Sequence, residues 1–271
     1  MPYVIHDRKY HFSSIFDPKT GAYVRTGIIE DGKDTGIDPF MASFPHLIDV
    51  GVMGHCIHGK TGLCVKAGIG CYQSGLTVDE PNMAVDEFRW IAEQCRHKTN
   101  QFALGGRGDP DQHEHFEDLL RICRDNDIVP NFTTSGYGMT PEIAALCKKY
   151  CGAVAVSWYR SDYTLRAIRM LLDAGVKTNI HYVLGKNTID EALERLGAGD
   201  FPIGINGIVF LLHKPAGLGS QTNVLSDDDP RVAEFFRYVD CGSRRYKVGV
   251  DSCTVPGIVN HCRRVTPQSL D

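Results

Sequence analysis

The chain has 271 residues, 42% of them hydrophobic, and a formal net charge of −4. It is long enough to bury a substantial core, and an α/β barrel of about 250 residues would use nearly all of it. No block of five like charges and no apolar run of 18 residues is present, so the sequence indicates neither broad nucleic-acid binding nor a membrane span. The first residues lack the apolar centre of a signal peptide, and we expect a soluble, cytoplasmic protein.

The N-terminal residues 1–45 do not follow the periodicity of the rest of the chain. Residues 14–25 predict a β-hairpin, because the turn-forming sequence Pro-Lys-Thr-Gly separates two strand-like runs. We interpret residues 1–45 as an N-terminal extension packed on the main domain.

From residue 46 onward, short apolar segments alternate with amphipathic ones. Strands are expected near residues 50, 103, 131, 155, 180, 208 and 248. Helices are expected over residues 83–98, 113–127, 141–150, 163–174, 188–196 and 231–240. The inner strands recur every 24 to 28 residues, the size of a β–α unit, and are apolar throughout, as in a parallel sheet covered on both faces. The periodicity leaves open whether this α/β sheet is doubly wound or forms a closed or partial barrel.

Ten cysteines are many for a chain of this size. Cys95, Cys123 and Cys147 each lie on the apolar side of an expected helix. We therefore interpret these three as small buried hydrophobic residues.

Three other cysteines, Cys56, Cys64 and Cys71, lie on a glycine-rich segment directly after the first of the repeating strands. Ligands bind beyond the C-terminal ends of parallel strands, and the segment leaves its strand at that end. Soft thiolates favour zinc or an iron–sulfur centre, and three of them leave one coordination position open. Structural zinc sites usually have short paired spacings and a fourth ligand, for which His55 and His58 are the obvious candidates. The residues alone leave zinc, an iron–sulfur centre and a purely structural role open.

Short polar or glycine-rich motifs follow the later strands in turn. They are Gly105-Gly106-Arg107-Gly108-Asp109, Ser135-Gly136, Ser157-Trp158-Tyr159, Asn179-Ile180-His181 and His213-Lys214-Pro215. Together with the preceding cysteine segment, this ordered series resembles the radical S-adenosylmethionine (radical SAM) enzymes over residues 46–255.

The resemblance implies a partial (β/α)6-type TIM barrel of parallel strands, with residues 256–271 as a C-terminal tail. It also implies a [4Fe-4S] cluster on Cys56, Cys64 and Cys71, with S-adenosyl-L-methionine (SAM) on the fourth iron. One electron would cleave SAM to methionine and a 5′-deoxyadenosyl radical, which removes hydrogen from a substrate. The electron would come from a low-potential donor such as flavodoxin or ferredoxin.

The strand-end motifs supply the residues expected to bind the cofactor. These are Gly105, Gly106, Arg107, Asp109, Ser135, Ser157, His181 and Lys214. The glycines would let the methionine part of SAM approach the backbone without a Cβ in the way. Each of the serines and His181 has an alternative role as a strand-end cap, and Lys214 either holds an anionic group or simply ends its strand.

Two features depart from the family pattern. The usual spacing is Cys-x3-Cys-x2-Cys, whereas here seven and six residues separate the cysteines. The usual Gly-Gly-Glu is Gly-Gly-Arg, so Asp109 or a backbone carbonyl would have to receive the ammonium group of SAM. His55 or His58 is a further candidate ligand of the stretched cysteine segment.

Asp251 and Cys253, after the last strand, are the candidate catalytic residues. Cys253 is interpreted as a buried thiol, a ligand of an auxiliary cluster or a residue that meets the substrate radical. Residues 204–217 and 251–253 are similar to the peptide-modifying branch of the family, which often carries a cysteine-rich C-terminal extension. That extension is missing here, and the sequence Thr266-Pro267 predicts a helix start cut short.

We therefore expect an oxidoreductase or transferase acting on a peptide or protein. The alternatives are a radical SAM enzyme acting on a small molecule or nucleotide, and a non-catalytic iron–sulfur or zinc module.

Overall fold

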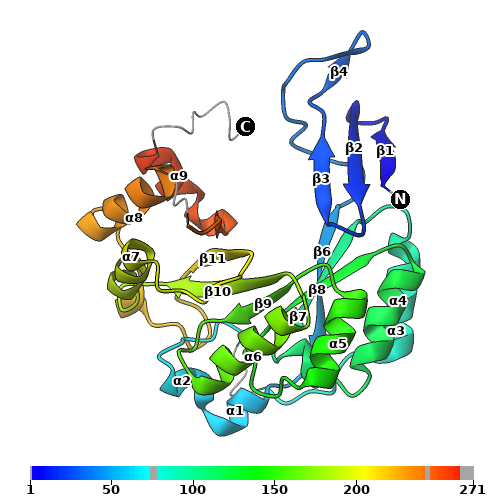
Figure 1. Ribbon diagram of the computed structural model, residues 1–271. Helices are drawn as coiled ribbons and strands as arrows, with labels where there is room; N and C mark the ends of the chain where they lie inside the picture. Colours follow the sequence, from blue (N-terminus) through cyan, green and yellow to red (C-terminus); the bar gives the residue numbers. More distant parts are fainter. Residues whose placement is uncertain (1, 74–77, 242–244, 263–271) are drawn as a thin grey trace.

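The computed structural model describes residues 2–73, 78–241 and 245–262. At its centre is a parallel sheet whose strands lie side by side in chain order (Figure 1). They are β6 (Leu47–Met53), β7 (Gln101–Gly106), β8 (Val129–Thr134), β9 (Val154–Ser157), β10 (Thr178–Leu184), β11 (Gly207–Leu212) and β12 (Val248–Val250). A doubly wound sheet would reverse its strand order, and this sheet does not. The fold is a partial β/α barrel in which β6 and β12 form the two edges of the sheet.

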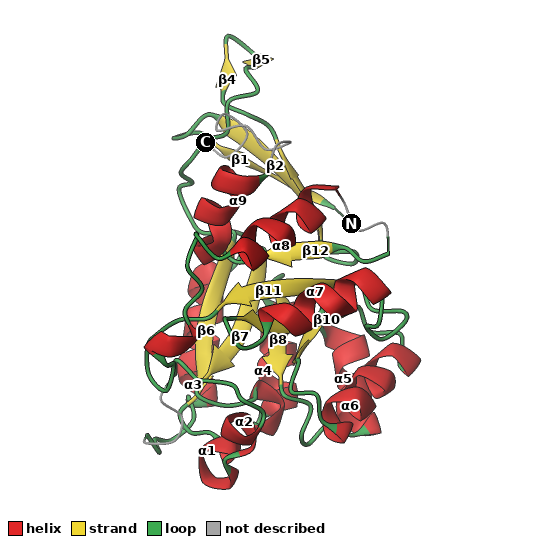
Figure 2. Ribbon diagram, turned by 90° about the vertical axis from the view of Figure 1, so that its left-hand side faces the viewer, coloured by secondary structure: helices red, strands yellow, loops and turns green. Residues whose placement is uncertain are grey.

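Six helices run along the outside of the sheet and follow the expected pattern (Figures 1 and 2). They are α3 (Val85–Cys95), α4 (Phe116–Asp125), α5 (Pro141–Tyr150), α6 (Asp162–Asp173), α7 (Ile189–Ala198) and α8 (Pro230–Cys241). Local sequence determines several of their ends. The Thr140 hydroxyl accepts a hydrogen bond from the Ile143 amide at the start of α5, and Ser161 does the same for Thr164 at the start of α6. Gly199, with φ of +69°, ends α7.

The core lies between the sheet and these helices. Phe88 of α3 and Phe102 of β7 are both fully buried and meet edge to face, with ring centroids 6.0 Å apart. Cys95, Cys123 and Cys147 are at most 4% exposed, which confirms that they act as small hydrophobic residues of the core.

The N-terminal residues form an antiparallel sheet of β1 (Tyr3–Asp7), β2 (Phe12–Asp17) and β3 (Ala22–Arg25). The predicted hairpin is confirmed as β2 and β3, whereas β1 was not predicted. A small ribbon, β4 (Ile29–Glu30) and β5 (Lys33–Asp34), follows. The Tyr3 hydroxyl donates to Asn100, just before β7, and the Lys177 ammonium donates to the carbonyl of Thr20, just before β10. The N-terminal sheet therefore contacts the barrel at the N-terminal ends of its strands.

The cysteine segment, residues 54–73, lies at the opposite end of the barrel (Figures 1 and 2). It contains two short helices, α1 (Ile57–Thr61) and α2 (Leu63–Lys66). Beyond β12 come the 3-10 turn η3 (Ser252–Thr254) and α9 (Val255–His261), which the sequence had not indicated; η1 (Pro110–Gln112) and η2 (Gln221–Asn223) are similar short turns. The expected helix start at Thr266 and Pro267 lies outside the described residues. None of the described helices has the length and apolar character needed to cross a membrane.

Candidate active site

A cavity of about 700 Å³ lies at the C-terminal ends of the parallel strands. Its size is within the range of small-molecule and cofactor sites. Its wall is built from β6 to β11 and from the last part of the cysteine segment. The site is therefore where the barrel architecture places ligands.

The structure brings many of the sequence-predicted residues to this cavity. Those that line it are Cys71, Gly105, Gly106, Arg107, Asp109, Ser157 and His181. Cys56, Cys64, Ser135, Lys214, Asp251 and Cys253 are not in its wall. Of the eight cofactor candidates, six therefore line the cavity, and Ser135 and Lys214 do not.

The glycines at the end of β7 have two separate roles. A Cβ on Gly105 would meet nothing within 4 Å, so this residue leaves open space beside the cavity. A Cβ on Gly106 would lie 2.5 Å from the Met53 carbonyl oxygen, and its φ of +117° is a conformation that side-chain-bearing residues avoid. A Cβ on Gly108 would lie 2.5 Å from the His55 carbonyl oxygen. Gly106 and Gly108 therefore allow the β7 loop to pass close to β6 and to the cysteine segment.

Asp109 joins the cysteine segment to the end of β8. Its carboxylate accepts hydrogen bonds from the Ser135 amide at 3.0 Å and from the Ser135 hydroxyl. His58, which is 2% exposed, places Nε2 3.2 Å from the same carboxylate and 2.6 Å from the Ser135 hydroxyl. Most of the acceptor capacity of Asp109 is therefore used within the protein, and the Ser135 hydroxyl is engaged with both Asp109 and His58.

The remaining cavity residues differ in their surroundings. The Arg107 guanidinium pairs with Glu80 at 2.9 Å. His181 has Nδ1 3.2 Å from the Thr133 hydroxyl, and burial lowers its pKa to about 4. Its imidazole is therefore neutral at physiological pH and serves as a hydrogen-bonding group without charge.

The three candidate metal ligands border a common region. Burial raises the pKa of the Cys56 and Cys64 thiols, and the charge of Cys71 contributes at Cys64. Burial, followed by the charges of Asp109 and of all three cysteines, raises the pKa of the Tyr159 hydroxyl, which lies in the cavity wall. The thiols therefore all lie within electrostatic reach of one group at the cavity.

The donor set fits an iron–sulfur centre in its chemistry, because it consists of three soft thiolates. Among the described residues, however, no three His, Cys, Asp or Glu side chains are gathered closely enough to hold a metal ion. A centre on Cys56, Cys64 and Cys71 would therefore require these side chains to close together on loading.

Asp251 and Lys214 lie at the rim beside β11 and β12. The Asp251 carboxylate accepts a hydrogen bond from the Leu212 amide at 3.4 Å and lies 3.9 Å from the Lys214 ammonium. The Lys214 ammonium is also 5.4 Å from the ring centroid of Tyr72, in the cysteine segment. Lys214 thus lies between the candidate catalytic residue Asp251 and the cysteine segment.

The interpretation of Cys253 as a buried thiol is wrong, because its side chain is exposed. It lies in the single turn η3, where the next residue, Thr254, takes the buried position with 3% exposure. Cys253 borders a second, smaller cavity rather than the one described above.

Sequence reasoning missed one buried acid near the site. Asp111 is 6% exposed, and neither carboxylate oxygen has a hydrogen-bond partner within the described part of the chain. Burial and then the charge of Asp109 raise its pKa to about 7. Nothing in the sequence distinguished it from an ordinary loop aspartate, since only the fold buries it behind Asp109.

No protein-family model matches the chain, and no curated protein matches it. Solved structures do. SuiB of Streptococcus suis bound to its precursor peptide SuiA is 12% identical with a TM-score of 0.64, over 93% of this chain and 73% of that one. The anSMEcpe structure with bound AdoMet and the Cp18Cys peptide is 15% identical with a TM-score of 0.55, over 75% and 63%.

Methylornithine synthase (PylB) is more distant, at 11% identity and a TM-score of 0.50, over 72% of this chain and 62% of that chain. The chain spans less than two thirds of the PylB and anSMEcpe chains. All three proteins are radical SAM enzymes. The chain has the partial-barrel fold of the radical SAM enzymes.

Proposed function

We propose that the chain is a radical SAM enzyme that removes a hydrogen atom from a peptide or protein substrate. The observation that carries this proposal is the cavity at the strand ends, where the segment bearing Cys56, Cys64 and Cys71 meets the open backbone at Gly105. A [4Fe-4S] cluster held by the three cysteines would supply the electron that cleaves SAM to a 5′-deoxyadenosyl radical, with flavodoxin or ferredoxin as its source.

The residues around the cavity have distinct parts in this proposal. Gly105 leaves room for the methionine part of SAM, and the neutral His181 and Ser157 are available to its polar groups. Asp109 acts mainly by fixing His58 and so the cysteine segment. Backbone carbonyls near Gly105, rather than the occupied Asp109 carboxylate, would then receive the ammonium group.

A peptide substrate is favoured over a small metabolite by two observations. The barrel is not closed, because β6 and β12 each have one strand neighbour in the central sheet, and an open side admits an extended chain. Two of the similar proteins are solved with peptides bound, SuiA on SuiB and Cp18Cys on anSMEcpe. Asp251, at the rim beside Lys214, is the group we propose to face that substrate, with exposed Cys253 nearby.

The test is anaerobic reconstitution of the chain with iron and sulfide. We expect about four iron atoms per chain, a broad charge-transfer absorption, and formation of 5′-deoxyadenosine from SAM and a reductant. Cys64→Ala should abolish all three. Cys151→Ala, which removes a cysteine outside the cysteine segment, is the matched control and should retain them. Deoxyadenosine formation that survives Cys64→Ala would disprove the ligand assignment.

A second candidate is a non-catalytic zinc module, and one observation favours it. His58 Nδ1 is buried without a hydrogen-bond partner among the described residues, and a histidine with three cysteines is a common structural zinc set. Metal analysis decides between the candidates, because one zinc without sulfide, together with no SAM binding, would support the module.

A further inference from the structure

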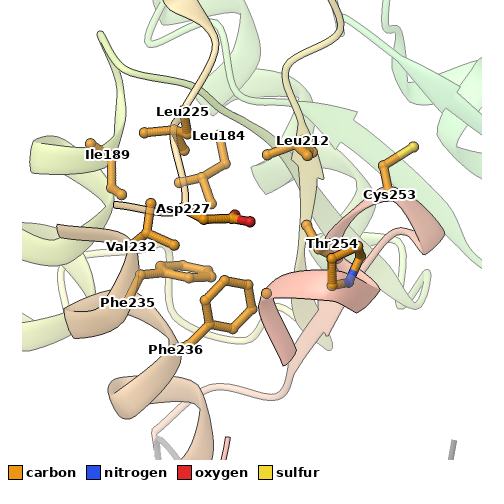
Figure 3. Close-up of a pocket in the computed structure, with 12 residues that line it drawn as sticks. Leu184, Ile189, Leu212, Leu225, Asp227, Val232, Phe235, Phe236, Cys253 and Thr254 are labelled. Atoms are coloured by element: carbon orange, nitrogen blue, oxygen red, sulfur yellow. The ribbon is translucent and has the colours of Figure 1, made fainter. Parts of the chain in front are cut away.

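A second cavity, of about 220 Å³, lies on the other face of the same two strands (Figure 3). Val183 and Leu211 line the larger cavity of the candidate active site, which we call the cofactor cavity. Their neighbours Leu184 and Leu212 line the second cavity. Successive side chains of a strand point to opposite faces, so β10 and β11 separate the two cavities. At 220 Å³ the second cavity is smaller than ordinary small-molecule sites and has the size for a single side chain.

Its wall combines apolar side chains with one acid. Leu225, Val232, Phe235 and Phe236 supply much of the apolar surface. Figure 3 shows the Asp227 carboxylate among these side chains, near the middle of the labelled group. A carboxylate beside aliphatic and aromatic surface is the combination that recognises a cation on an apolar stem.

Asp227 is exposed, and within the described part of the chain its carboxylate makes neither a hydrogen bond nor an ion pair. Two of the nearby basic groups, Arg231 and Lys214, have other partners. The Arg231 guanidinium is 2.6 Å from Asp229 and 2.7 Å from Asp190, and the Lys214 ammonium faces Asp251. The Asp227 carboxylate is therefore open to pair with a cation that enters the cavity from solvent.

We propose that this cavity binds the side chain of a lysine or arginine residue of the peptide substrate. The aliphatic stem packs against Leu225 and Val232, and the ammonium or guanidinium group pairs with Asp227. Leu184 and Leu212 end β10 and β11, so the bound residue lies next to the rim of the cofactor cavity. The substrate's identity as a peptide rests on the proposed function, but the binding itself requires neither SAM nor a metal.

The test uses two probes whose amino and carboxyl ends are blocked, so that only the side chain can be charged. They are N-acetyl-lysine methylamide and its neutral counterpart, N-acetyl-norleucine methylamide. Binding to the full chain, without SAM, is followed by NMR of the methyl groups of Leu184, Leu212 and Leu225. We expect the lysine probe to shift these resonances with a Kd in the range of about 1 mM, and the norleucine probe to bind about threefold more weakly.

Two variants locate the charge. Asp227→Asn should weaken binding of the lysine probe about threefold, to the level of the norleucine probe. Asp228→Asn, which removes the neighbouring carboxylate outside the cavity wall, should leave the Kd unchanged. Equal binding of both probes to the unaltered chain, an unchanged Kd in Asp227→Asn, or shifts confined to other leucines would overturn the proposal. Because no SAM is present, these results stand apart from the deoxyadenosine test.

Discussion

The low pKa of His181 makes a specific prediction about acid stability. Burial lowers the pKa of His181 from the reference value of 6.5 to about 4. Between these two pH values the imidazole is therefore neutral in the folded chain and protonated in the unfolded chain. Below pH ~6.5 the unfolded state therefore binds more protons, and stability falls as the pH falls towards the folded value. The contribution is fully present at neutral pH and above.

The magnitude follows from the shift of about 2.5 pKa units. At about 1.4 kcal/mol per unit the full effect is about 3 kcal/mol, of which about 2 kcal/mol is lost by pH ~5. In His181→Gln this proton-linked loss is absent. The difference in unfolding free energy between pH ~8 and pH ~5 should therefore be about 2 kcal/mol smaller in the variant than in the unaltered chain.

Urea unfolding followed by circular dichroism at the two pH values measures this difference. His6→Gln, which removes an exposed histidine, is the matched control. Other titrating groups, such as Asp111, are common to all three proteins and cancel in the comparison. An identical pH dependence in His181→Gln and the unaltered chain would refute the reasoning, because His181 would then titrate alike in both states.

Two further predictions concern the glycines at the end of β7 and the buried acid Asp111. Gly105→Ala places a methyl group in open space beside the cavity, so unfolding should change by less than about 1 kcal/mol while calorimetry shows weaker SAM binding. Gly106→Ala meets the Met53 carbonyl and should destabilise the fold by about 2 kcal/mol or more; equal stability of the two variants would contradict this contrast. Asp111 has a raised pKa, so it stabilises the fold at low pH and loses this contribution as the pH rises through about 7. Thermal melting of Asp111→Asn should therefore show a relative gain in stability above that pH, and a constant difference from the unaltered chain would count against it.

The sequence predicted the central sheet well because its strands are buried on both faces and carry continuous apolar runs. It predicted β6 to β12 and their intervening helices within a few residues. It did not predict β1, in which only the polar Asp7 is buried, or α9, a single short helix at the surface. Such marginal elements are stabilised by tertiary contacts rather than by their own pattern.

The candidate site was predictable as a region but less so in its individual contacts. Strand-end position alone brings Ser157 and His181 to the cavity, since all parallel strands end at one edge. The engagement of Asp109 by Ser135 and His58 depends on residues far apart in the chain, and no local pattern encodes it. The exposure of Cys253 likewise depends on how one short turn is oriented after β12.

The loop after β11, which is far from the cysteine segment in sequence, contacts that segment directly. The Leu218 amide donates to the Cys71 carbonyl at 2.8 Å, and a Cβ on Gly217 would lie 2.7 Å from the same oxygen. The conformation around Cys71 thus depends on contacts with residues that are synthesised about 150 positions later in the chain. During translation, the ribosome must release most of the polypeptide before this part of the pocket takes its final shape. If the chain carries the cluster proposed above, its insertion would accordingly follow, rather than accompany, synthesis of the first half.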